Sequence, residues 1–420
     1  MAKYLVTGGQ ALSGAVRVSG AKNAVLPTLA AILLTPETCV LHDIPDLRDV
    51  QVMMEILRLL GVKLVVTQDE TRRHLLACAG SLDTFEIRAD LTRQMRSSIF
   101  LMGPLLGRLG KVRIAYPGGC AIGPRPIDLH LRGLAALGAR IVERYGYIEA
   151  EAPRLRGVEI HLDFPSVGAT ENIMMAAVLA DGVTVIRNAA KEPEIVDLQN
   201  LLNAMGARVK GAGMDAIRIE GVRRLHDATH NVIPDRIEAG TFMIAAAITQ
   251  GDVLLENVIP EHVESTSAKL REAGVNVREI GECMRVTNKG RVHAVDIKTL
   301  PYPGFPTDMH PQMMALMSVC QGTSMITETV FENRFSQAEE LRRMGANIKI
   351  EGRTAVISGV EMLSGATVEA ADLRSGAALV LAGLVAEGQT AVEGAIHIER
   401  GYENLDGKLR GLGAIVERVE

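Results

Sequence analysis

Met205-Gly206-Ala207-Arg208-Val209 is one of six copies of a short phrase that decides the fold of this 420-residue chain. Each copy has a large apolar residue or alanine, a glycine, a small residue, any residue, and then a β-branched residue or leucine. The other copies are Leu60-Gly61-Val62-Lys63-Leu64, Leu137-Gly138-Ala139-Arg140-Ile141, Ala273-Gly274-Val275-Asn276-Val277, Met344-Gly345-Ala346-Asn347-Ile348 and Leu412-Gly413-Ala414-Ile415-Val416. Successive glycines are 68 to 77 residues apart, a spacing that indicates a repeated structural unit.

The pattern around each glycine predicts two helices and several strands per unit. The glycine ends one helix and opens a strand, as a C-terminal cap does. A second helix, apolar nearly all round, lies upstream and stops near a glycine; examples are 172–180 before Gly182, 241–248 before Gly251, 312–319 before Gly322 and 377–386 before Gly388. The strands instead alternate, as in Ile217-Arg218-Ile219. Because this reverses the usual α/β arrangement, we expect an inside-out fold with buried helices and solvent-facing sheets.

Six units divide naturally into two domains of three. We place the break near residues 229–234, where the pattern is interrupted. One domain then spans 22–233, and a discontinuous one spans 1–21 plus 234–420, in which the first residues, with a strand at 15–18, complete the sixth unit. The expected fold class is α/β, with two inside-out barrel-like domains, and a ligand site is expected in the cleft between them.

The composition is that of a globular protein, with 47% hydrophobic and 23% charged residues. A net charge of -5, 3% aromatic residues and no tryptophan argue against nucleic acid as a partner. Five cysteines without a Cys-x-x-Cys pair argue against a disulfide framework or a metal site and fit a reducing compartment. No stretch matches a leader or a membrane span. We therefore expect a cytoplasmic protein that does not contact membranes.

Reactive chemistry is concentrated in a loop of glycine and proline at residues 116–128. Cys120 and Arg125 lie five residues apart there, and a nearby cation gives a thiol thiolate character. Three glycines and three prolines favour a loop with a few discrete shapes, as a lid requires. The alternative is that Cys120 is a small packed hydrophobic residue, which a glycine-rich surface loop makes less attractive.

Polar residues recur where the buried helices are expected to begin. They are Lys22, Asn23, Arg96, Ser97, Ser98, residues 166–171, Asp235, Arg236, Glu238, Asp308, Asp372 and Arg374. Helix N-termini bind anions, so these ends suit a multiply anionic ligand. The alternative is local: Asp308 and Asp372 would cap their helices, and Arg96, Arg125, Arg374 and Arg400 would be solvated surface charges.

The motifs together resemble the UDP-N-acetylglucosamine 1-carboxyvinyltransferase family of enolpyruvyl transferases over the whole chain. They include Ser19-Gly20-Ala21-Lys22-Asn23-Ala24, Pro117-Gly118-Gly119-Cys120-Ala121-Ile122-Gly123-Pro124-Arg125-Pro126-Ile127-Asp128, Ser166-Val167-Gly168-Ala169-Thr170, Phe305-Pro306-Thr307-Asp308-Met309, Phe331-Glu332-Asn333-Arg334-Phe335 and Arg400-Gly401-Tyr402-Glu403. The resemblance implies transfer of enolpyruvate from phosphoenolpyruvate to the 3′-hydroxyl of UDP-N-acetylglucosamine, with release of phosphate. This reaction makes the first committed precursor of peptidoglycan and so serves cell-wall synthesis, cell shape and division.

The same resemblance assigns roles residue by residue. Cys120 would be the lid thiol and the target of the antibiotic fosfomycin, and Asp308 would take the proton of the sugar hydroxyl. Lys22, Arg125 and Arg400, assisted by Arg96 and Arg374, would hold phosphate and carboxylate. The nucleotide sugar would be contacted by Asn23, Asp128, Leu129, Ser166, Val167, Gly168 and Val330. No metal or other cofactor is implied. A carboxylate near a helix N-terminus is stabilised as the anion, so Asp308 is also expected to orient the hydroxyl.

One departure and two rival functions accompany this hypothesis. Some family members carry a lysine two residues before the serine that matches Ser166, whereas this chain has Phe164, so the diphosphate contacts depend on Arg125 and backbone amides. The rivals are the sister transferase that acts on shikimate 3-phosphate and a non-catalytic paralogue that binds nucleotide sugar. The first lacks the cysteine lid, and the second would have lost Cys120, Asp308 or Lys22. The sequence leaves the oligomeric state open.

Overall fold

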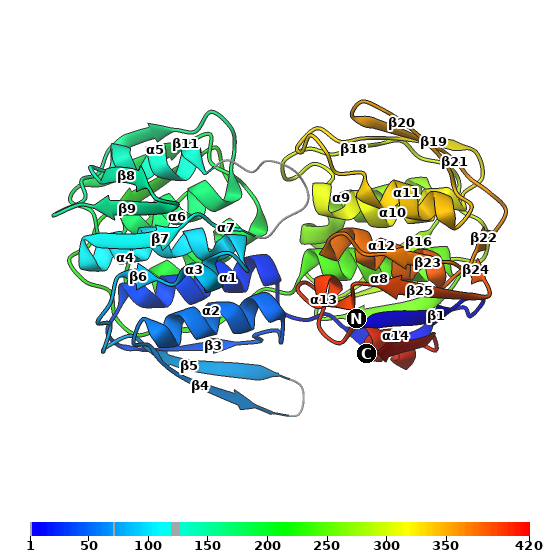
Figure 1. Cartoon of the computed structure of the whole chain (residues 1–420), viewed down its shortest axis with the longest axis horizontal. Coiled ribbons are helices and arrows are strands. Elements are labelled where there is room, and N and C mark those ends of the chain that lie inside the picture. The colour runs from blue at the N-terminus through cyan, green and yellow to red at the C-terminus, as the bar shows by residue number, and fades with distance from the viewer. Residues whose placement is uncertain (1, 70–71, 119–126) are drawn as a thin grey trace. The chain divides into compact units, whose positions relative to one another are not determined.

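The computed structural model describes residues 2–69, 72–118 and 127–420, and it divides into two compact units. The continuous unit contains residues 20–118 and 127–233, and the discontinuous unit contains residues 2–19 and 234–420. Figure 1 labels many of the elements of each unit. The chain passes from one unit to the other after Ser19 and again after Ile233. Each unit has its own hydrophobic core.

The continuous unit carries seven α-helices in its described residues. They are α1 (Lys22–Ala31), α2 (Arg48–Leu59), α3 (Ala89–Thr92), α4 (Met102–Leu109), α5 (Asp128–Ala136), α6 (Val167–Ala177) and α7 (Pro193–Ala204), with 3-10 turns η1 (Ile32–Leu34) and η2 (Arg96–Leu101). Its strands are β3 (Thr38–His42), β4 (Lys63–Gln68), β5 (Arg73–Cys78), β6 (Glu86–Ile87), β7 (Lys111–Ala115), β8 (Arg140–Arg144), β9 (Tyr147–Glu151), β10 (Glu159–His161), β11 (Val183–Arg187), β12 (Arg208–Lys210), β13 (Ala216–Glu220) and β14 (Thr229–Asn231).

The discontinuous unit repeats this plan. Its helices are α8 (Arg236–Ile248), α9 (Glu264–Glu272), α10 (His310–Ser318), α11 (Ser336–Arg343), α12 (Leu373–Gly383), α13 (Ala395–Ile398) and α14 (Leu405–Gly411), with 3-10 turns η3 (Pro260–Val263) and η4 (Thr307–Met309). Its strands are β1 (Lys3–Thr7), β2 (Ser13–Arg17), β15 (Asp252–Glu256), β16 (Asn276–Ile280), β17 (Cys283–Thr287), β18 (Ile297–Lys298), β19 (Thr323–Thr327), β20 (Asn347–Glu351), β21 (Thr354–Ser358), β22 (Leu363–Ser364), β23 (Thr367–Glu369), β24 (Ala386–Glu387), β25 (Gln389–Glu393) and β26 (Ile415–Val419).

Six four-stranded sheets share one topology, three in each unit. The orders are β14-β3-β5-β4, β6-β7-β9-β8 and β10-β11-β13-β12 in the continuous unit, and β2-β15-β17-β16, β18-β19-β21-β20 and β23-β25-β1-β26 in the other. In every sheet the first strand pairs in parallel with the second, and the remaining pairs are antiparallel. The sixfold repeat predicted from the glycine phrase is therefore confirmed.

The N-terminal residues serve two different sheets. The strand predicted at 15–18 is β2, and it pairs with β15 in the fourth sheet, so its assignment to the sixth unit was wrong. The sixth sheet is completed by β1, which lies between β25 and β26. Periodicity identifies a strand but carries no information about its partner when the two are more than 200 residues apart in sequence.

The six glycines of the repeated phrase all adopt the left-handed conformation. Their φ angles lie between 92° and 102°, at Gly61, Gly138, Gly206, Gly274, Gly345 and Gly413. Each follows the downstream helix of its unit, which is α2, α5, α7, α9, α11 or α14, and precedes a strand. This is the position of a helix C-terminal cap. Residues with a Cβ rarely adopt this conformation, so the glycines explain how each helix stops and the chain turns into the sheet.

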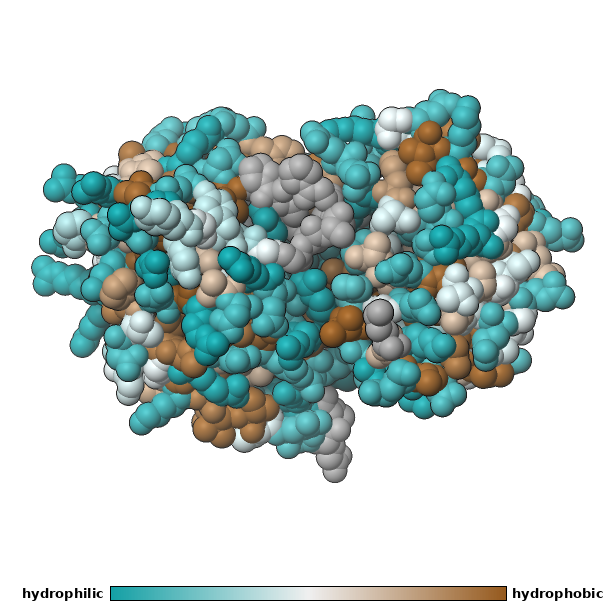
Figure 2. Space-filling view, viewed as in Figure 1, coloured by the Kyte–Doolittle hydropathy of each residue, from teal (hydrophilic) through white to brown (hydrophobic). Residues whose placement is uncertain are grey.

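The upstream helices are buried on all sides, as predicted. Every residue of α10 is buried, and in α8 only Arg236 is not. Strands such as β13 bury alternate residues instead, which leaves one face of each sheet to solvent, and Figure 2 shows polar residues over most of the surface in view. Each unit therefore has buried helices in its core and sheets around them, which confirms the inside-out fold.

Helix ends differ from the sequence prediction in two ways. The buried helices stop before the expected glycine: α6 ends at Ala177, and α12 ends at Gly383 while residues 386–387 form β24. The second buried helix begins as a 3-10 turn, η2, before continuing as α4. Among the residues that the structure describes, no helix has the length and apolar character of a membrane span.

Candidate active site

Two residues of the predicted cysteine loop, Cys120 and Arg125, lie outside the described residues. The other predicted site residues are all described. In the continuous unit they are Lys22, Asn23, Arg96, Asp128, Leu129, Ser166, Val167 and Gly168; in the discontinuous unit they are Asp308, Val330, Arg374 and Arg400.

Lys22 is the first residue of helix α1 and is buried, with only 7% of its surface exposed. Its Nζ lies 2.8 Å from Asp49 Oδ2, on helix α2. Both side chains of this ion pair are more than nine-tenths buried. A buried charge of this kind requires a partner of opposite sign, so Asp49 holds the ammonium at the start of α1. Asn23, the next residue, is exposed.

A pocket of about 320 Å³ in the continuous unit brings Arg96 and Asp128 together. Arg96 is the first residue of η2, and Asp128 is the first residue of α5. Pro117 and Ile127, from the two sides of the undescribed segment 119–126, also line this pocket. Two predicted contact residues that are distant in sequence therefore share one depression, which adjoins both ends of the cysteine loop.

Ser166 caps the buried helix α6. Its Oγ accepts a hydrogen bond from Ala169 N at 3.3 Å. Val167 and Gly168 follow and are half-buried. A Cβ added to Gly168 would lie 3.0 Å from His130 Cε1, a tight contact that would require the His130 side chain of α5 to shift.

Asp308 lies in η4, and two arginines hold its carboxylate, which is 27% exposed. Arg334 Nη2 donates to Oδ1 at 2.7 Å, and Arg374 Nε donates to Oδ2 at 3.2 Å. Burial by itself raises the pKa of Asp308, but the charges of Arg334 and Arg374 outweigh it and hold that pKa well below its ordinary value. The carboxyl is therefore ionised at neutral pH and is a weak base.

Arg374 is 1% exposed. Its guanidinium lies over the ring of Tyr402, 5.2 Å from the centroid. Burial lowers the pKa of Arg374, but Tyr402 and Asp308 raise it further than burial lowers it. Tyr402 OH is in turn 3.0 Å from Thr241 Oγ1 and accepts from Gln312 Nε2 at 3.0 Å. This network fixes Arg374 in the core, so it is not the solvated surface charge that the alternative reading offered.

Capping accounts for some of the polar helix starts but not for Asp308. Asp235 Oδ1 accepts from the first backbone amides of α8. Asp372 Oδ1 accepts from those of α12, and Ser375 Oγ completes a capping box by accepting from Asp372 N. Asp308 makes no such cap. Its carboxylate instead pairs with Arg334 and Arg374.

The remaining predicted residues lie close to these elements in sequence. Val330 follows β19, and its backbone N donates to Glu328 Oε1 at 2.7 Å. Arg400 follows α13 and is half-buried. Leu129 is the second residue of α5 and is also half-buried.

Sequence reasoning missed two residues that hold predicted site residues in place, Asp49 and Arg334. Arg334 belongs to a motif that carried the resemblance, but the pattern gave no reason to assign it to Asp308. Asp49 carried a weaker signal, an acidic residue in the first turn of α2. Both roles depend on contacts between elements, which periodicity does not report.

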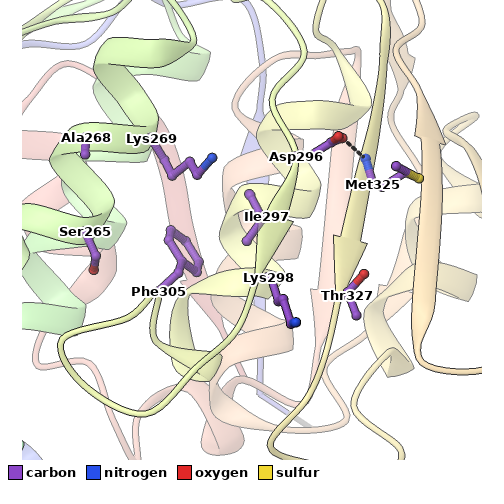
Figure 3. Close-up of a pocket in the computed structure, with 9 residues that line it drawn as sticks. All are labelled: Ser265, Ala268, Lys269, Asp296, Ile297, Lys298, Phe305, Met325 and Thr327. Carbon is purple, nitrogen blue, oxygen red and sulfur yellow. Dashed lines mark hydrogen bonds between the residues drawn. The ribbon is translucent and has the colours of Figure 1, made fainter.

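A second pocket, of about 390 Å³, lies in the discontinuous unit and is lined from α9, β18 and β19 (Figure 3). Lys269 and Lys298 project at its wall, and Phe305 is among its apolar residues. Asp296 Oδ1 accepts from Met325 N at 2.8 Å, which joins β19 to the segment before β18. None of the predicted site residues lines this pocket.

Within residues 2–69, 72–118 and 127–420, no group of three or more His, Cys, Asp or Glu side chains is arranged to hold a metal ion. Four cysteines of these ranges are free thiols, and burial raises the pKa of two of them, Cys39 and Cys320.

Comparison with known proteins assigns the chain to a family. The family model described as EPSP synthase (3-phosphoshikimate 1-carboxyvinyltransferase) matches residues 6–409. UDP-N-acetylglucosamine 1-carboxyvinyltransferase 1 of Symbiobacterium thermophilum is 64% identical over 99% of this chain and 95% of the relative. The relative with the same name in Caldanaerobacter subterraneus is 58% identical, over 99% of both chains. The chain belongs to the UDP-N-acetylglucosamine 1-carboxyvinyltransferase family.

Solved structures place this UDP-N-acetylglucosamine 1-carboxyvinyltransferase family member in a known fold. The enolpyruvyl transferase NikO from Streptomyces tendae matches with a TM-score of 0.89 and 24% identity, over 100% of this chain and 99% of that one. EPSP synthase from Acinetobacter baumannii matches with a TM-score of 0.78 and 18% identity, over 100% of both. The predicted fold class is confirmed, because the similarity extends through all six repeats at low identity.

Proposed function

We propose that this enzyme transfers the enolpyruvyl group of phosphoenolpyruvate to the 3′-hydroxyl of UDP-N-acetylglucosamine and releases phosphate. The observation that carries this conclusion is the 64% identity over nearly the whole length of a UDP-N-acetylglucosamine 1-carboxyvinyltransferase. The product is the first committed precursor of peptidoglycan, and we place the reaction in the cytoplasm.

The reaction is an addition followed by an elimination. A proton is added to C3 of phosphoenolpyruvate while the sugar oxygen bonds to C2 and loses its own proton. The tetrahedral intermediate then loses a proton from C3, the bond between C2 and the phosphate oxygen breaks, and inorganic phosphate leaves. The protein must therefore supply an acid, a proton acceptor and cations for a phosphate and a carboxylate.

We assign these roles by the resemblance and by the charges of the described residues. Asp308 orients the sugar hydroxyl and accepts its proton; the low pKa of its carboxyl favours orientation in the ground state and proton acceptance as the new bond forms. Cys120 serves at the lid and donates the proton to C3. The cationic residues for phosphate and carboxylate are Lys22, Arg96, Arg125, Arg374 and Arg400, and the contacts to the nucleotide sugar are Asn23, Asp128, Leu129, Ser166, Val167, Gly168 and Val330.

These assigned residues come from both units, and we propose that the reaction depends on residues of both. Lys22 belongs to the continuous unit and Asp308 to the discontinuous one. Each is held by partners from its own unit, Asp49 for Lys22 and two arginines for Asp308. A single reaction that needs both a phosphate-binding cation and a proton acceptor is therefore expected to fail when either residue is removed.

Phosphate release tests the function directly. Purified protein is expected to release phosphate from phosphoenolpyruvate only when UDP-N-acetylglucosamine is present. Asp308→Asn and Lys22→Ala are each expected to lower kcat/KM by about 100-fold or more, as losses of transition-state groups do. Arg343→Gln, at an exposed arginine of α11, is the control with unchanged kinetics. Release of phosphate that does not depend on the sugar nucleotide would contradict the proposal.

The same assay separates the two rival functions. Shikimate 3-phosphate in place of UDP-N-acetylglucosamine is expected to give no phosphate, although the matching family model is named for that reaction. The relatives at 54–64% identity are named for the sugar nucleotide, whereas the solved EPSP synthases are 18% identical. A non-catalytic paralogue would bind UDP-N-acetylglucosamine in calorimetry and release no phosphate with either acceptor.

Alkylation by fosfomycin tests the assignment of Cys120. The epoxide reacts with thiolates, and among the described cysteines Cys39 and Cys320 are buried thiols whose pKa is raised by burial. Peptide mapping is expected to find one adduct, at Cys120, and none in Cys120→Ser. An adduct at any of the other four cysteines, or no adduct in the presence of UDP-N-acetylglucosamine, would refute the assignment.

A further inference from the structure

Glu328 is a buried carboxylate that joins two parts of the proposed site. It follows β19 and is 1% exposed. Its Oε1 accepts from Thr299 Oγ1 at 2.9 Å, Val330 N at 2.7 Å and Phe331 N at 3.0 Å. Its Oε2 accepts from Thr307 Oγ1 at 2.6 Å. A buried carboxylate with four hydrogen-bond donors fixes the position of every group that donates to it.

Thr307 connects Glu328 to Asp308. Arg334 Nη1 donates to Thr307 Oγ1 at 2.7 Å, and because a guanidinium has no acceptor, the threonine oxygen must accept this bond. The single hydroxyl hydrogen of Thr307 is then directed to Glu328. Arg334 Nη2 donates to Asp308 Oδ1 at 2.7 Å. The direction of every bond from Asp308 to Glu328 is thus determined.

The other carboxylate oxygen of Glu328 holds the backbone of the segment that contains Val330. Two successive amides, of Val330 and Phe331, point at Oε1, which fixes the turn after β19. The two branches meet again at Arg334, whose guanidinium lies 5.1 Å from the centroid of the Phe331 ring. The geometry of Val330 and that of Asp308 are therefore set by the same carboxylate.

His310 also faces this carboxylate but does not neutralise it. His310 Nε2 lies 3.4 Å from Glu328 Oε2, but the two atoms do not form a hydrogen bond. Burial and the charge of Arg334 hold the pKa of His310 well below its ordinary value, so the ring is neutral at physiological pH. Hydrogen bonds from hydroxyl and amide groups, rather than a histidinium, stabilise Glu328.

We propose that Glu328 is a positioning residue for the transfer reaction, with one branch through Thr307 and Arg334 to Asp308 and a second branch through backbone amides to Val330. This inference rests on the proposed function, which assigns Asp308 to the sugar hydroxyl and Val330 to the nucleotide sugar. Glu328 itself is not required to touch either substrate. Its two branches are separable by substitution.

Glu328→Gln tests the branch to Asp308. The amide oxygen of glutamine can replace Oε1 and keep the bonds from Val330 and Phe331, but its NH2 group cannot accept the hydroxyl hydrogen of Thr307, so the hydrogen bond that Thr307 donates is lost. We expect kcat to fall by about tenfold or more, because a small displacement of a catalytic group is costly, and KM for UDP-N-acetylglucosamine to stay within about twofold. Thr307→Val is expected to act in the same way. The double variant is expected to be no more damaging than the more damaging single variant, because both substitutions break the same connection.

Glu328→Ala tests the second branch. It removes the acceptor for both backbone amides, so KM for UDP-N-acetylglucosamine is expected to rise by about threefold or more in addition to the fall in kcat. Glu351→Gln, at an exposed glutamate of the same sheet, is the matched control with wild-type kinetics. The thermal midpoint of each variant separates these effects from loss of folded protein.

A pH profile distinguishes positioning from a merely structural role. Asp308 faces Arg334, Arg374 of α12 and, at longer range, Arg236 of α8. When Thr307→Val removes an acceptor of Arg334, this arginine is held less firmly against Asp308, and the acid limb of kcat/KM is expected to move to higher pH. A reduced fraction of folded enzyme would scale the profile without moving it.

The outcomes separate this inference from the proposed function. If wild-type protein releases no phosphate with UDP-N-acetylglucosamine, the proposed function and this inference are both refuted. If wild-type protein is active but Glu328→Gln and Thr307→Val keep its kcat and its acid limb, the branch to Asp308 is refuted. If Glu328→Ala keeps KM, the branch to Val330 is refuted. Should Glu328→Ala fail to fold, Glu328→Gln and Thr307→Val still decide the branch to Asp308, and wild-type kinetics in both overturn the proposal, which requires that branch.

Discussion

Two arginines decide the protonation of Asp308, although the carboxyl is partly buried. Arg334→Gln removes one of them and is expected to raise the pKa of Asp308. Burial raises this pKa, and one positive charge fewer is then left to lower it. The acid limb of kcat/KM should therefore lie at higher pH than in the wild type, with activity lost earlier as pH falls. A pH series of phosphate release measures this shift.

Arg343→Gln, on the exposed face of α11, is the control for that series and should leave the limb in place. A folded Arg334→Gln protein with an unmoved acid limb would show that Asp308 does not control it. The sequence predicted that Asp308 is stabilised as the anion but assigned this to a helix N-terminus. The arginines responsible are 26 and 66 residues away in sequence, and only the folded chain brings them to the carboxyl.

Glu171 of α6 is a second buried carboxyl, with the opposite shift. It is fully buried, and neither of its oxygens has a hydrogen-bond partner among the described residues. Burial first, and then the nearby acids Glu194, Glu192 and Asp197, raise the pKa of Glu171 well above its ordinary value. The carboxyl is therefore held neutral in the folded protein at a pH where it ionises in the unfolded chain.

Glu171→Gln should flatten the dependence of stability on pH. The raised pKa of Glu171 means that its contribution is fully present below the unfolded pKa, near 4.3, and is lost as pH rises toward the folded pKa. Glutamine does not titrate, so the wild-type melting temperature should fall more than that of the variant between pH 5 and about pH 8. Calorimetry measures both curves. Parallel curves would mean that Glu171 does not keep its proton.

At the scale of single elements, two of the glycines that end the downstream helices offer a matched pair of substitutions. Gly138 and Gly61 have φ angles of 102° and 93° and lie in the same unit. A Cβ at Gly138 would have its nearest neighbour at 3.9 Å, whereas a Cβ at Gly61 would lie 2.3 Å from the backbone oxygen of Ser81. The pair separates backbone strain from steric clash.

Gly138→Ala is expected to cost about 1 kcal/mol of unfolding free energy, the strain of a left-handed alanine. Gly61→Ala adds overpacking against backbone and should cost about 3 kcal/mol. Denaturant unfolding of each variant gives the comparison. Equal losses would mean that the chain near Ser81 moves away at little cost.

The elements themselves were largely predictable, and their ends were not. The pattern of apolar residues and the capping glycines identify the helices, because the same strong local signal recurs six times. The early end of α12 depends on β24, a two-residue strand that pairs with β22. No local sequence pattern predicts a strand as short as this. The 3-10 turn η2, with which the second buried helix begins, likewise has no sequence signature, since Arg96, Ser97 and Ser98 suit several kinds of helix start.

At the scale of the whole molecule, the two units are related as circular permutations of one plan. The continuous unit begins with α1 and ends with β14, whereas in the discontinuous unit the strands β1 and β2 precede everything else and β26 ends the chain. Lys3 pairs with Val419, so β1 and β26 are adjacent in one sheet. This arrangement follows from pairing over the length of the chain, which the repeat spacing alone does not fix.

Two fragments test this relation. Residues 234–420 alone lack the strand between β25 and β26 and should expose unpaired edges and aggregate. The same fragment followed by a short linker and residues 1–19 should unfold cooperatively, because Lys3 and Val419 already face each other. Thermal unfolding followed by circular dichroism compares the two. Cooperative unfolding of residues 234–420 alone would contradict the expectation.

The place of β1 between β25 and β26 has a consequence for protein synthesis. The first strand leaves the ribosome before either of its neighbours exists, and at roughly 5 to 20 residues per second it waits on the order of 20 to 80 s for them. During that time the continuous unit is fully translated and free to fold. Strand β1 must therefore stay accessible and unaggregated until β25 and β26 have been translated, and only then can the sixth sheet be completed.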